Sequence, residues 1–401
     1  MRAHAFGWTS DTPIVVFGDD WGRHVSSMQH LFRHVAERHP VIWVNGIGHR
    51  VPRLRRGDAR RAWQKARAML GGGATGSRGD VDIGARPRLV LQPRVLPWHH
   101  WRAVHALNTR SLLRSLRQAL GQLGMSAPPL LVTGSPPSVG VVGRLGEVAS
   151  VYFCMDDFLH LPDVSPEMLG PLEQRLLRRV DAVVATARSL LESKRPRSGK
   201  VYYLPQGVNY EHFAAPQPQP SDLARLPRPW IGFAGGVTTP VDVDLVHRLA
   251  AEFSTGSIVM VGPVALPRTA LEAPNIHLLG PRLYWDLPGY LQAFDVGLIP
   301  YVLNPHTIAV DPLKLLEYLA AGIPVVTTDL PEVRKYSQAV SIASTHDAFV
   351  AAVRTAIERP EGTPRQRQSV AREHGWNRRA ADLLEVFADV VEGRSSGVAV
   401  G

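Results

Sequence analysis

Short runs of β-branched and aromatic residues alternate with helix-length amphipathic segments along the chain. In the first half, the strand-like runs are 12–17, 41–45, 89–92, 130–133, 150–155, 181–186 and 201–204. Segments 26–38, 108–123 and 171–180 lie between them and have the spacing of apolar residues that is typical of helices. This alternation predicts βαβ units, and therefore a doubly wound parallel sheet with helices on both faces.

A proline-rich stretch interrupts the alternation in the middle of the chain, with prolines at 216, 218, 220, 227 and 229. Because proline lacks an amide donor and restricts φ, such a stretch favours an extended linker. Strand-like runs then resume at 230–234, 257–261, 276–279, 296–300, 325–328 and 340–342. We predict two α/β domains, residues 1–215 and 216–380, followed by a C-terminal helix and tail over 381–401. The last helix is expected near 378–391, with a loose tail from Arg394.

The composition fits soluble domains in a reducing compartment. The chain has 401 residues, of which 45% are hydrophobic. No stretch approaches the roughly 18 consecutive apolar residues that span a bilayer, and the N-terminal residues lack the apolar core of a signal peptide. The lone Cys154 excludes an internal disulfide and a cysteine-based zinc site. These features predict a cytoplasmic protein.

The positive charge is concentrated in the first half of the chain. The net charge is +10 overall; residues 1–215 carry 29 − 16 = +13, and residues 216–401 carry 16 − 19 = −3. A polyanion, an anionic membrane surface or a phosphate-bearing substrate would each explain a basic half, as would solubility alone. Segment 50–70 combines eight basic residues with Trp63, the pattern of an interfacial membrane helix. The alternative is a solvated helix that packs Trp63 on its own domain.

Segment 311–328 carries the most informative chemistry. Its pattern predicts a loop, a helix that begins near Pro312, a turn at Gly322 and a buried strand. The free amides of a helix N-terminus suit a diphosphate, Lys314 adds a positive charge, and Glu317 can accept hydrogen bonds from ribose hydroxyls. The alternative is that Glu317 only lies on the surface of a helix.

This segment resembles the donor-binding signature of the retaining group-one (glycosyltransferase 4-like) sugar transferases, which use nucleotide sugars. Glu317 matches the glutamate that holds the donor ribose in that family. Further similar blocks lie earlier in the chain, in the family's order, at 181–187, 204–213, 279–291 and 295–300. The resemblance is nearest to bacterial envelope-polysaccharide, teichuronic-acid-type transferases. It implies the GT-B fold, in which two Rossmann-like doubly wound domains face each other across a cleft.

The resemblance also implies a donor site, with two departures from the family pattern. A second, sugar-contacting glutamate is replaced by Ala309, and segment 232–239 lacks the usual Arg and Lys that clamp the diphosphate. Donor binding is therefore expected from Gly235, Gly236, Pro312, Leu313, Lys314 and Glu317, with Gly280 in the stretch beside the nucleotide base. Gly235 and Gly236 would serve equally in a tight strand-to-helix turn.

Polar residues also follow two predicted strands of the first half. Asp156 and Asp157 come directly after the run 150–155, and Asp156 takes the position of the family's sugar-contacting histidine. Either carboxylate could orient a hydroxyl or act as the acceptor's base, or simply cap a helix. Acceptor-binding candidates after the first strand are Asp20, Arg23 and His24. The cluster of His and Trp residues at 96–101 could line an acceptor pocket or be buried in the domain.

These patterns predict a glycosyltransferase of the hexosyltransferase type, which moves a sugar from a nucleotide-diphosphate donor to an acceptor hydroxyl with retention of configuration. The expected acceptor is a lipid-linked or envelope glycan, and the enzyme is expected in the cytoplasm or at the inner face of the plasma membrane. No metal, cofactor or nucleic acid is implied. A nucleotide-sugar epimerase or hydrolase of the same fold and a nonenzymatic polyanion-binding protein remain as alternatives.

Overall fold

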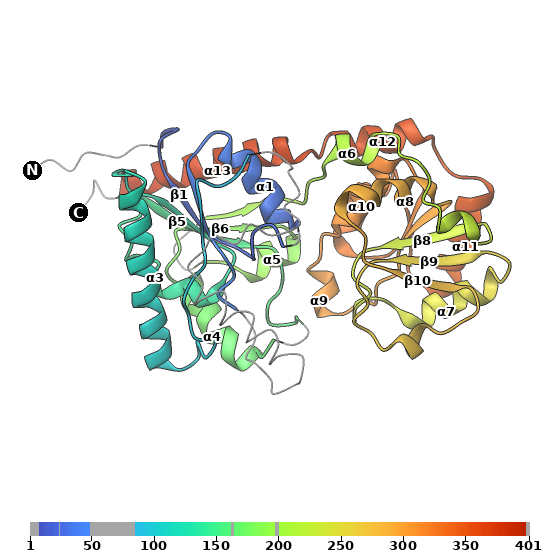
Figure 1. Cartoon of the computed structure of the whole chain (residues 1–401), viewed down its shortest axis with the longest axis horizontal. Helices are drawn as coiled ribbons and strands as arrows, with labels where there is room; N and C mark the ends of the chain where they lie inside the picture. The colour runs from blue at the N-terminus through green and yellow to red at the C-terminus, as the bar shows by residue number, and fades with distance from the viewer. Residues whose placement is uncertain (1–7, 24, 49–84, 162–163, 197–199, 398–401) are drawn as a thin grey trace, which may run out of the picture. The chain divides into compact units, whose positions relative to one another are not determined.

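The computed structural model describes residues 8–23, 25–48, 85–161, 164–196 and 200–397 (Figure 1). The chain forms two compact units. The N-terminal unit comprises Met1–Leu204 and Ala380–Gly401, and the C-terminal unit comprises Pro205–Arg379. The basic segment 50–70 and His24 lie outside the described residues.

The N-terminal unit contains a parallel seven-stranded sheet in the order β3-β2-β1-β4-β5-β6-β7. Its strands are β1 (Ile14–Phe17), β2 (Val41–Val44), β3 (Leu89–Leu91), β4 (Leu130–Thr133), β5 (Ala149–Cys154), β6 (Ala182–Ala185) and β7 (Lys200–Tyr203). Every residue of β1, β2, β4, β5 and β6 is buried, as expected for strands covered on both faces. The predicted strand runs of this half are confirmed.

Its helices are α1 (Ser27–Ala36), α3 (Arg102–Gln122), α4 (Pro166–Leu177) and α5 (Arg188–Ser193), with a 3₁₀ segment η1 (Pro136–Gly140). Ser26 caps α1 by accepting a hydrogen bond from the Gln29 amide. The predicted starts of α3 and α4, at 108 and 171, are too late, because the helices begin at Arg102 and Pro166. Proline suits the first position of α4, since the amide there has no partner within the helix.

The C-terminal unit contains a parallel six-stranded sheet in the order β10-β9-β8-β11-β12-β13. Its strands are β8 (Trp230–Ala234), β9 (Ser257–Val261), β10 (Ile276–Gly280), β11 (Val296–Ile299), β12 (Val325–Thr328) and β13 (Ser341–Ala343). All six match the predicted runs within about two residues.

Helices cover both faces of this second sheet. Helices α8 (Leu287–Ala293) and α10 (Leu313–Ala321) pack against each other on one face, and α7 (Val243–Glu252) and α11 (His346–Glu358) on the other (Figure 1). The shorter helices are α6 (Tyr210–Ala214), α9 (Pro305–Ile308) and α12 (Pro364–Arg372). As predicted, α10 starts after Pro312 and ends at Gly322.

The division between the units differs from the predicted domain boundary at 215/216. The compact units change over after Leu204, before the proline-rich stretch. Helix α6 contacts α10 and α12, and this packing places it in the C-terminal unit. The last helix, α13 (Trp376–Gly397), belongs to the N-terminal unit from Ala380 onward. It continues to Gly397, so the prediction of a loose tail from Arg394 is wrong for that part.

In the described residues, no helix combines the length and the apolar character that crossing a bilayer requires. In each unit, the short strands supply many of the buried apolar residues.

We expect Gly232→Ala to destabilise the C-terminal unit, because a Cβ there would lie 2.0 Å from the Phe294 ring. Phe294 is buried and cannot move away cheaply, so overpacking should lower the free energy of unfolding by about 1–3 kcal/mol. Thermal or urea unfolding measures this change. Gly121→Ala is the control, because a Cβ at that helical position meets nothing within 4 Å. Equal stability of the two variants would contradict the packing at β8.

Candidate functional site

Chain connections leave β8 and β11, the two central strands of the C-terminal sheet, in opposite directions. Their carboxyl ends therefore form the topological switch point at which open α/β sheets bind ligands. Three segments meet there: the loop after β8, the end of β11 with Tyr301, and the first turn of α10. The predicted donor-site residues Gly235 and Lys314 come from two of these segments, and Glu317 lies in the next turn of α10.

Two loops touch at this edge with no room for side chains. The Gly235 amide donates to the Val261 carbonyl at 2.8 Å, and a Cβ on Gly262 would lie 1.9 Å from the Gly235 carbonyl oxygen. Gly235 and Gly262 have φ values of 138° and 146°, which L-residues with a side chain rarely adopt. The loop after β8 therefore exposes backbone rather than side chains at the switch point.

Lys314 lies across the ends of β8 and β11. Its Nζ donates a hydrogen bond to the Tyr301 hydroxyl and lies 5.1 Å from the centroid of the Phe233 ring. A Cβ on Gly235 would lie 2.9 Å from Lys314 Cε, so the lysine stem passes directly over this glycine. The side chain thus places one positive charge beside the glycine loop, where the sequence predicts the diphosphate.

Glu317 follows Lys314 by three residues and therefore lies on the same side of α10. Burial raises the pKa of Glu317 to about 7, and the neighbouring Lys314 charge opposes this rise. A carboxylate that is costly to ionise in the empty site would be stabilised by hydroxyl donors from a ligand. This property suits the predicted contact with ribose hydroxyls.

The N-terminus of α10 carries no side-chain cap, and Pro312 occupies the capping position. Pro312 is buried and Leu313 half-buried, so the first turn of the helix is held in the fold. The preceding Asp311 fixes the loop: its Oδ2 accepts hydrogen bonds from the Gln206 amide at 3.0 Å and from Lys335 Nζ at 2.8 Å. Burial raises the pKa of Asp311, while Lys335 opposes that effect.

Gly280, the predicted neighbour of the nucleotide base, ends β10 and accepts a hydrogen bond from the Gly262 amide at 2.9 Å. It therefore belongs to the same row of strand ends as Gly235. The next cation along the chain, Arg282, binds Asp222 at 2.7 Å and donates to the Tyr290 hydroxyl at 2.6 Å. These two partners hold the Arg282 side chain against Asp222 and Tyr290.

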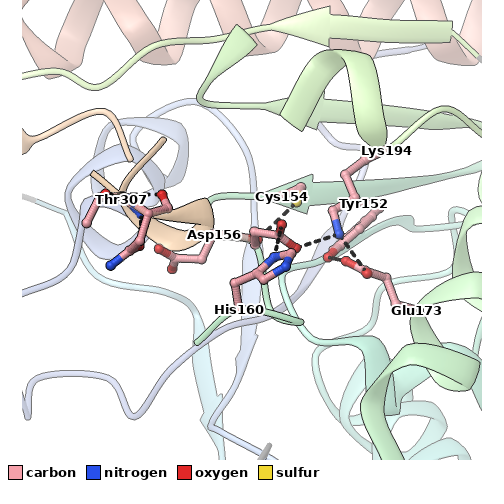
Figure 2. Close-up of polar contacts among 9 residues, drawn as sticks. Tyr152, Cys154, Asp156, His160, Glu173, Lys194 and Thr307 are labelled. Carbon is pink, nitrogen blue, oxygen red and sulfur yellow. Dashed lines mark hydrogen bonds and ion pairs between the residues drawn. The ribbon is translucent and has the colours of Figure 1, made fainter. Parts of the chain in front are cut away.

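In the N-terminal unit, Asp157 is tied into an ion-pair network at the end of β5 (Figure 2). Its two carboxylate oxygens accept from Lys194 Nζ at 2.9 Å and from His160 Nδ1 at 2.7 Å. Lys194 also binds the buried Glu173 at 2.8 Å, and Glu173 accepts from the Tyr152 hydroxyl at 2.8 Å. Burial alone would raise the pKa of Asp157, but hydrogen bonds from Lys194 and His160 hold it below its usual value.

Because of this network, Asp156 and Asp157 have different contacts and are suited to different roles. Asp157 stays ionised and orients His160, whose side chain is 47% exposed. Asp156 is half-buried, and its carbonyl accepts from the Cys154 thiol at 3.4 Å. Of the pair, Asp157 is therefore the less suited to accept a proton from a substrate.

The acceptor candidates lie after β1, and β4 separates them from the end of β5. Asp20 Oδ1 accepts from the Gly46 amide at 3.2 Å, which ties the loop after β1 to the loop after β2. Arg23 lies 3.4 Å from the other Asp20 oxygen, and its side chain is 64% exposed.

Several residues of these sites carry no sequence signal that predicts them. Lys194 ends a short helix, and Tyr301 follows β11. Each is placed by a partner that is distant in the sequence, Glu173 for Lys194 and Lys314 for Tyr301. Across the described residues, no three His, Cys, Asp or Glu side chains group as metal ligands.

Two parallel α/β units with their central strands in Rossmann order define the GT-B fold. Solved structures with this fold resemble the chain closely. Sucrose-phosphate synthase from Thermosynechococcus elongatus has a TM-score of 0.66 at 14% identity, over 95% of this chain and 100% of that one. Anabaena Alr3699/HepE in complex with UDP-glucose has a TM-score of 0.61 at 15% identity, over 93% and 99%.

Residues 228–359 match the family model described as glycosyl transferases group 1. The chain is also 30% identical, over 234 residues, to TuaH of Bacillus subtilis (strain 168), which is named as a teichuronic acid biosynthesis glycosyltransferase. That alignment covers 54% of this chain and 59% of the relative, so the chain spans about three fifths of the relative's length.

We expect Lys194→Met to destabilise the N-terminal unit by about 3–5 kcal/mol, because it leaves the buried Glu173 without its cation. Urea unfolding measures the loss. The double variant Lys194→Met with Glu173→Gln should recover much of the stability, since the amide carries no charge. His160→Ala removes a half-exposed partner and should cost less than about 1 kcal/mol. A double variant no more stable than Lys194→Met would refute this account of the network.

Proposed function

We propose that this protein is a glycosyltransferase (EC 2.4) that transfers a sugar from a nucleotide-diphosphate sugar to an acceptor hydroxyl. The observation that carries the proposal is the placement of Lys314 and Glu317 on one side of α10, with Lys314 directly over the Gly235 backbone. The family model that matches residues 228–359 and the UDP-glucose bound by a protein of the same fold support it.

Each donor-site residue has a defined role in the proposal. The Gly236 amide, the first turn of α10 and the Lys314 ammonium hold the diphosphate, since they present donors and positive charge. Gly235 leaves room for the Lys314 stem, and its own amide bonds the Val261 carbonyl. Pro312 and Leu313 position that turn. Glu317 accepts hydrogen bonds from the ribose, and Gly280 lies beside the base.

The proposed chemistry is electrostatic. As the bond between the sugar and the diphosphate breaks, negative charge grows on the leaving phosphate and positive charge on the anomeric carbon. Lys314 and the helix amides are fixed before the reaction, so they stabilise the leaving group without reorganising. We propose retention of configuration, in keeping with the family resemblance.

The acceptor side of the proposal rests on the N-terminal unit. We propose that Asp20 and Arg23 contact the acceptor, and that Asp156 orients its hydroxyl or accepts its proton, while Asp157 positions the His160 ring. A lipid-linked or polysaccharide acceptor is supported by the excess of 29 basic over 16 acidic residues in 1–215 and by the relative named for teichuronic acid biosynthesis. Such an acceptor would place a cytoplasmic enzyme against the inner face of the plasma membrane.

The pKa of Glu317 gives a direct test of donor binding. A ligand that donates hydroxyl hydrogens prefers the carboxylate, so affinity for UDP-glucose should fall as the pH decreases through about 7. Calorimetric titration from about pH 5.5 to 8 measures this, since the diphosphate of a nucleotide sugar does not titrate in that range. Glu317→Gln should bind weakly with little pH dependence. Unchanged affinity in this variant would remove Glu317 from the ribose role.

If Lys314 binds the diphosphate, its removal should weaken the binding of ligands that carry phosphates and leave the binding of other ligands unchanged. Lys314→Met should weaken binding of UDP-glucose by about tenfold or more, because a charge-assisted hydrogen bond to phosphate is lost. Binding of uridine, which has no phosphate, should change little. Lys200→Met is the matched control, because Lys200 is an exposed lysine of β7 that pairs with Asp389 in the N-terminal unit. Equal losses for UDP-glucose and uridine would contradict the proposed diphosphate contact.

The reaction class is tested by product analysis. Radiolabelled UDP-sugars incubated with membrane extracts should yield a glycolipid or glycan product, and incubation without acceptor should yield little product. Turnover without acceptor to free sugar, or to an epimeric nucleotide sugar, would replace the transferase with the hydrolase or epimerase alternative.

A further inference from the structure

Exposed apolar side chains are frequent in one stretch of the N-terminal unit. Ten large apolar residues are exposed in the described part of the chain, and six of them fall within residues 90–123: Val90, Leu96, Trp98, Trp101, Leu107 and Leu123. Four of the six, Leu96, Trp98, Trp101 and Leu107, lie in the loop before α3 and in its first two turns. Exposed apolar side chains that lie this close together often mark a contact surface.

The two tryptophans are held outward by a braced loop. Their rings stack with centroids 5.9 Å apart, and Trp98 and Trp101 are 37% and 55% exposed. Between them, His99 is buried and its Nε2 lies 2.9 Å from the Ile47 carbonyl oxygen. Asn108 of α3 bonds both the amide and the carbonyl of Leu96 at 2.8 Å. These contacts hold the loop in place, so the two tryptophan rings are exposed by a fixed loop conformation.

The same segment carries positive charge with no opposing carboxylate. The sequence has no Asp or Glu between Asp82 and Glu147, and it has eight Arg in that interval. On α3, Leu107, Arg110, Arg114 and Arg117 recur at helical spacing and are exposed, so they form one stripe beside the tryptophan loop. Figure 1 shows α3 as a long helix along one side of this unit.

We propose that this surface, formed by Trp98, Trp101, Leu107, Arg110 and Arg114, docks the protein on an anionic lipid bilayer. Stacked indole rings and a leucine partition into the headgroup boundary, and the arginines that follow Leu107 on the exposed side of α3 contact lipid phosphates. A nucleic acid or an anionic glycan would use the arginines but would gain little from exposed Leu107. The combination therefore favours lipid over a soluble polyanion.

The inference goes beyond the proposed glycosyl transfer, because it assigns a surface that takes no part in donor binding. It also differs from the sequence-based prediction that segment 50–70 is the membrane element. A vesicle-binding assay without donor or acceptor tests it separately from the enzyme activity.

The full chain should float with vesicles made of equal parts phosphatidylglycerol and phosphatidylcholine, and it should not float with phosphatidylcholine alone. Arg110→Gln with Arg114→Gln should lower the partition coefficient roughly tenfold to thirtyfold, since each arginine near the surface contributes about a fivefold factor. Trp98→Ala with Trp101→Ala should lower it by a similar factor and leave binding weak even at low salt. Circular dichroism verifies that each variant is folded.

Matched controls lie on the other unit. Arg359→Gln with Arg365→Gln removes the same charge from exposed positions, and Trp285→Ala removes an indole that is 48% exposed. Neither should change vesicle binding. The proposal is overturned if wild type ignores anionic vesicles, if the controls weaken binding equally, or if only neutralising Arg55, Arg56, Arg60 and Arg61 abolishes it. A loss with the arginine variant but not with the tryptophan variant would also overturn it, because that pattern indicates a polyanion site.

Discussion

The donor site depends on the contact between two loops at the carboxyl edge of the C-terminal sheet. The Gly235 carbonyl oxygen occupies the position that a Cβ of residue 262 would take, so neither loop tolerates a side chain there. Parallel pairing of β8 with β9 and β11 brings these loops and Tyr301 to the same edge. Because backbone lines this point, Lys314 can extend across Gly235 and present its charge where a diphosphate would lie.

The two units differ in where their charged side chains lie and in what those side chains contact. The C-terminal unit concentrates one lysine, one carboxylate of raised pKa and uncapped amides at the end of its central strands. In the N-terminal unit, the buried Lys194 pairs with internal carboxylates, and every described arginine except the buried Arg33 is exposed. A net charge of 16 − 19 = −3 over residues 216–401 is thus compatible with anion binding, because local geometry rather than net charge sets the potential at the site.

The aspartates after β5 show how tertiary contacts change the meaning of a motif. In the sequence, Asp156 and Asp157 are equivalent candidates at the end of a buried strand. In the structure, Asp157 is bonded to Lys194 and His160, and so it supports a neighbouring imidazole rather than facing substrate as a base. The positions of Lys194 and Glu173, 37 and 16 residues further along the chain, decide this.

The sequence by itself determined the strands, the class of fold and the helix that carries Lys314 and Glu317. Continuous apolar runs between amphipathic segments can be buried in few ways other than a doubly wound parallel sheet, and proline before and glycine after a helix mark its ends locally. Tertiary structure alone decided that α6 packs with the C-terminal unit, that α13 returns to the N-terminal unit, and that Trp98 and Trp101 face outward. Local periodicity specifies which side of a helix or strand is apolar. Residues far away in the chain decide which element covers that side, or whether it stays exposed.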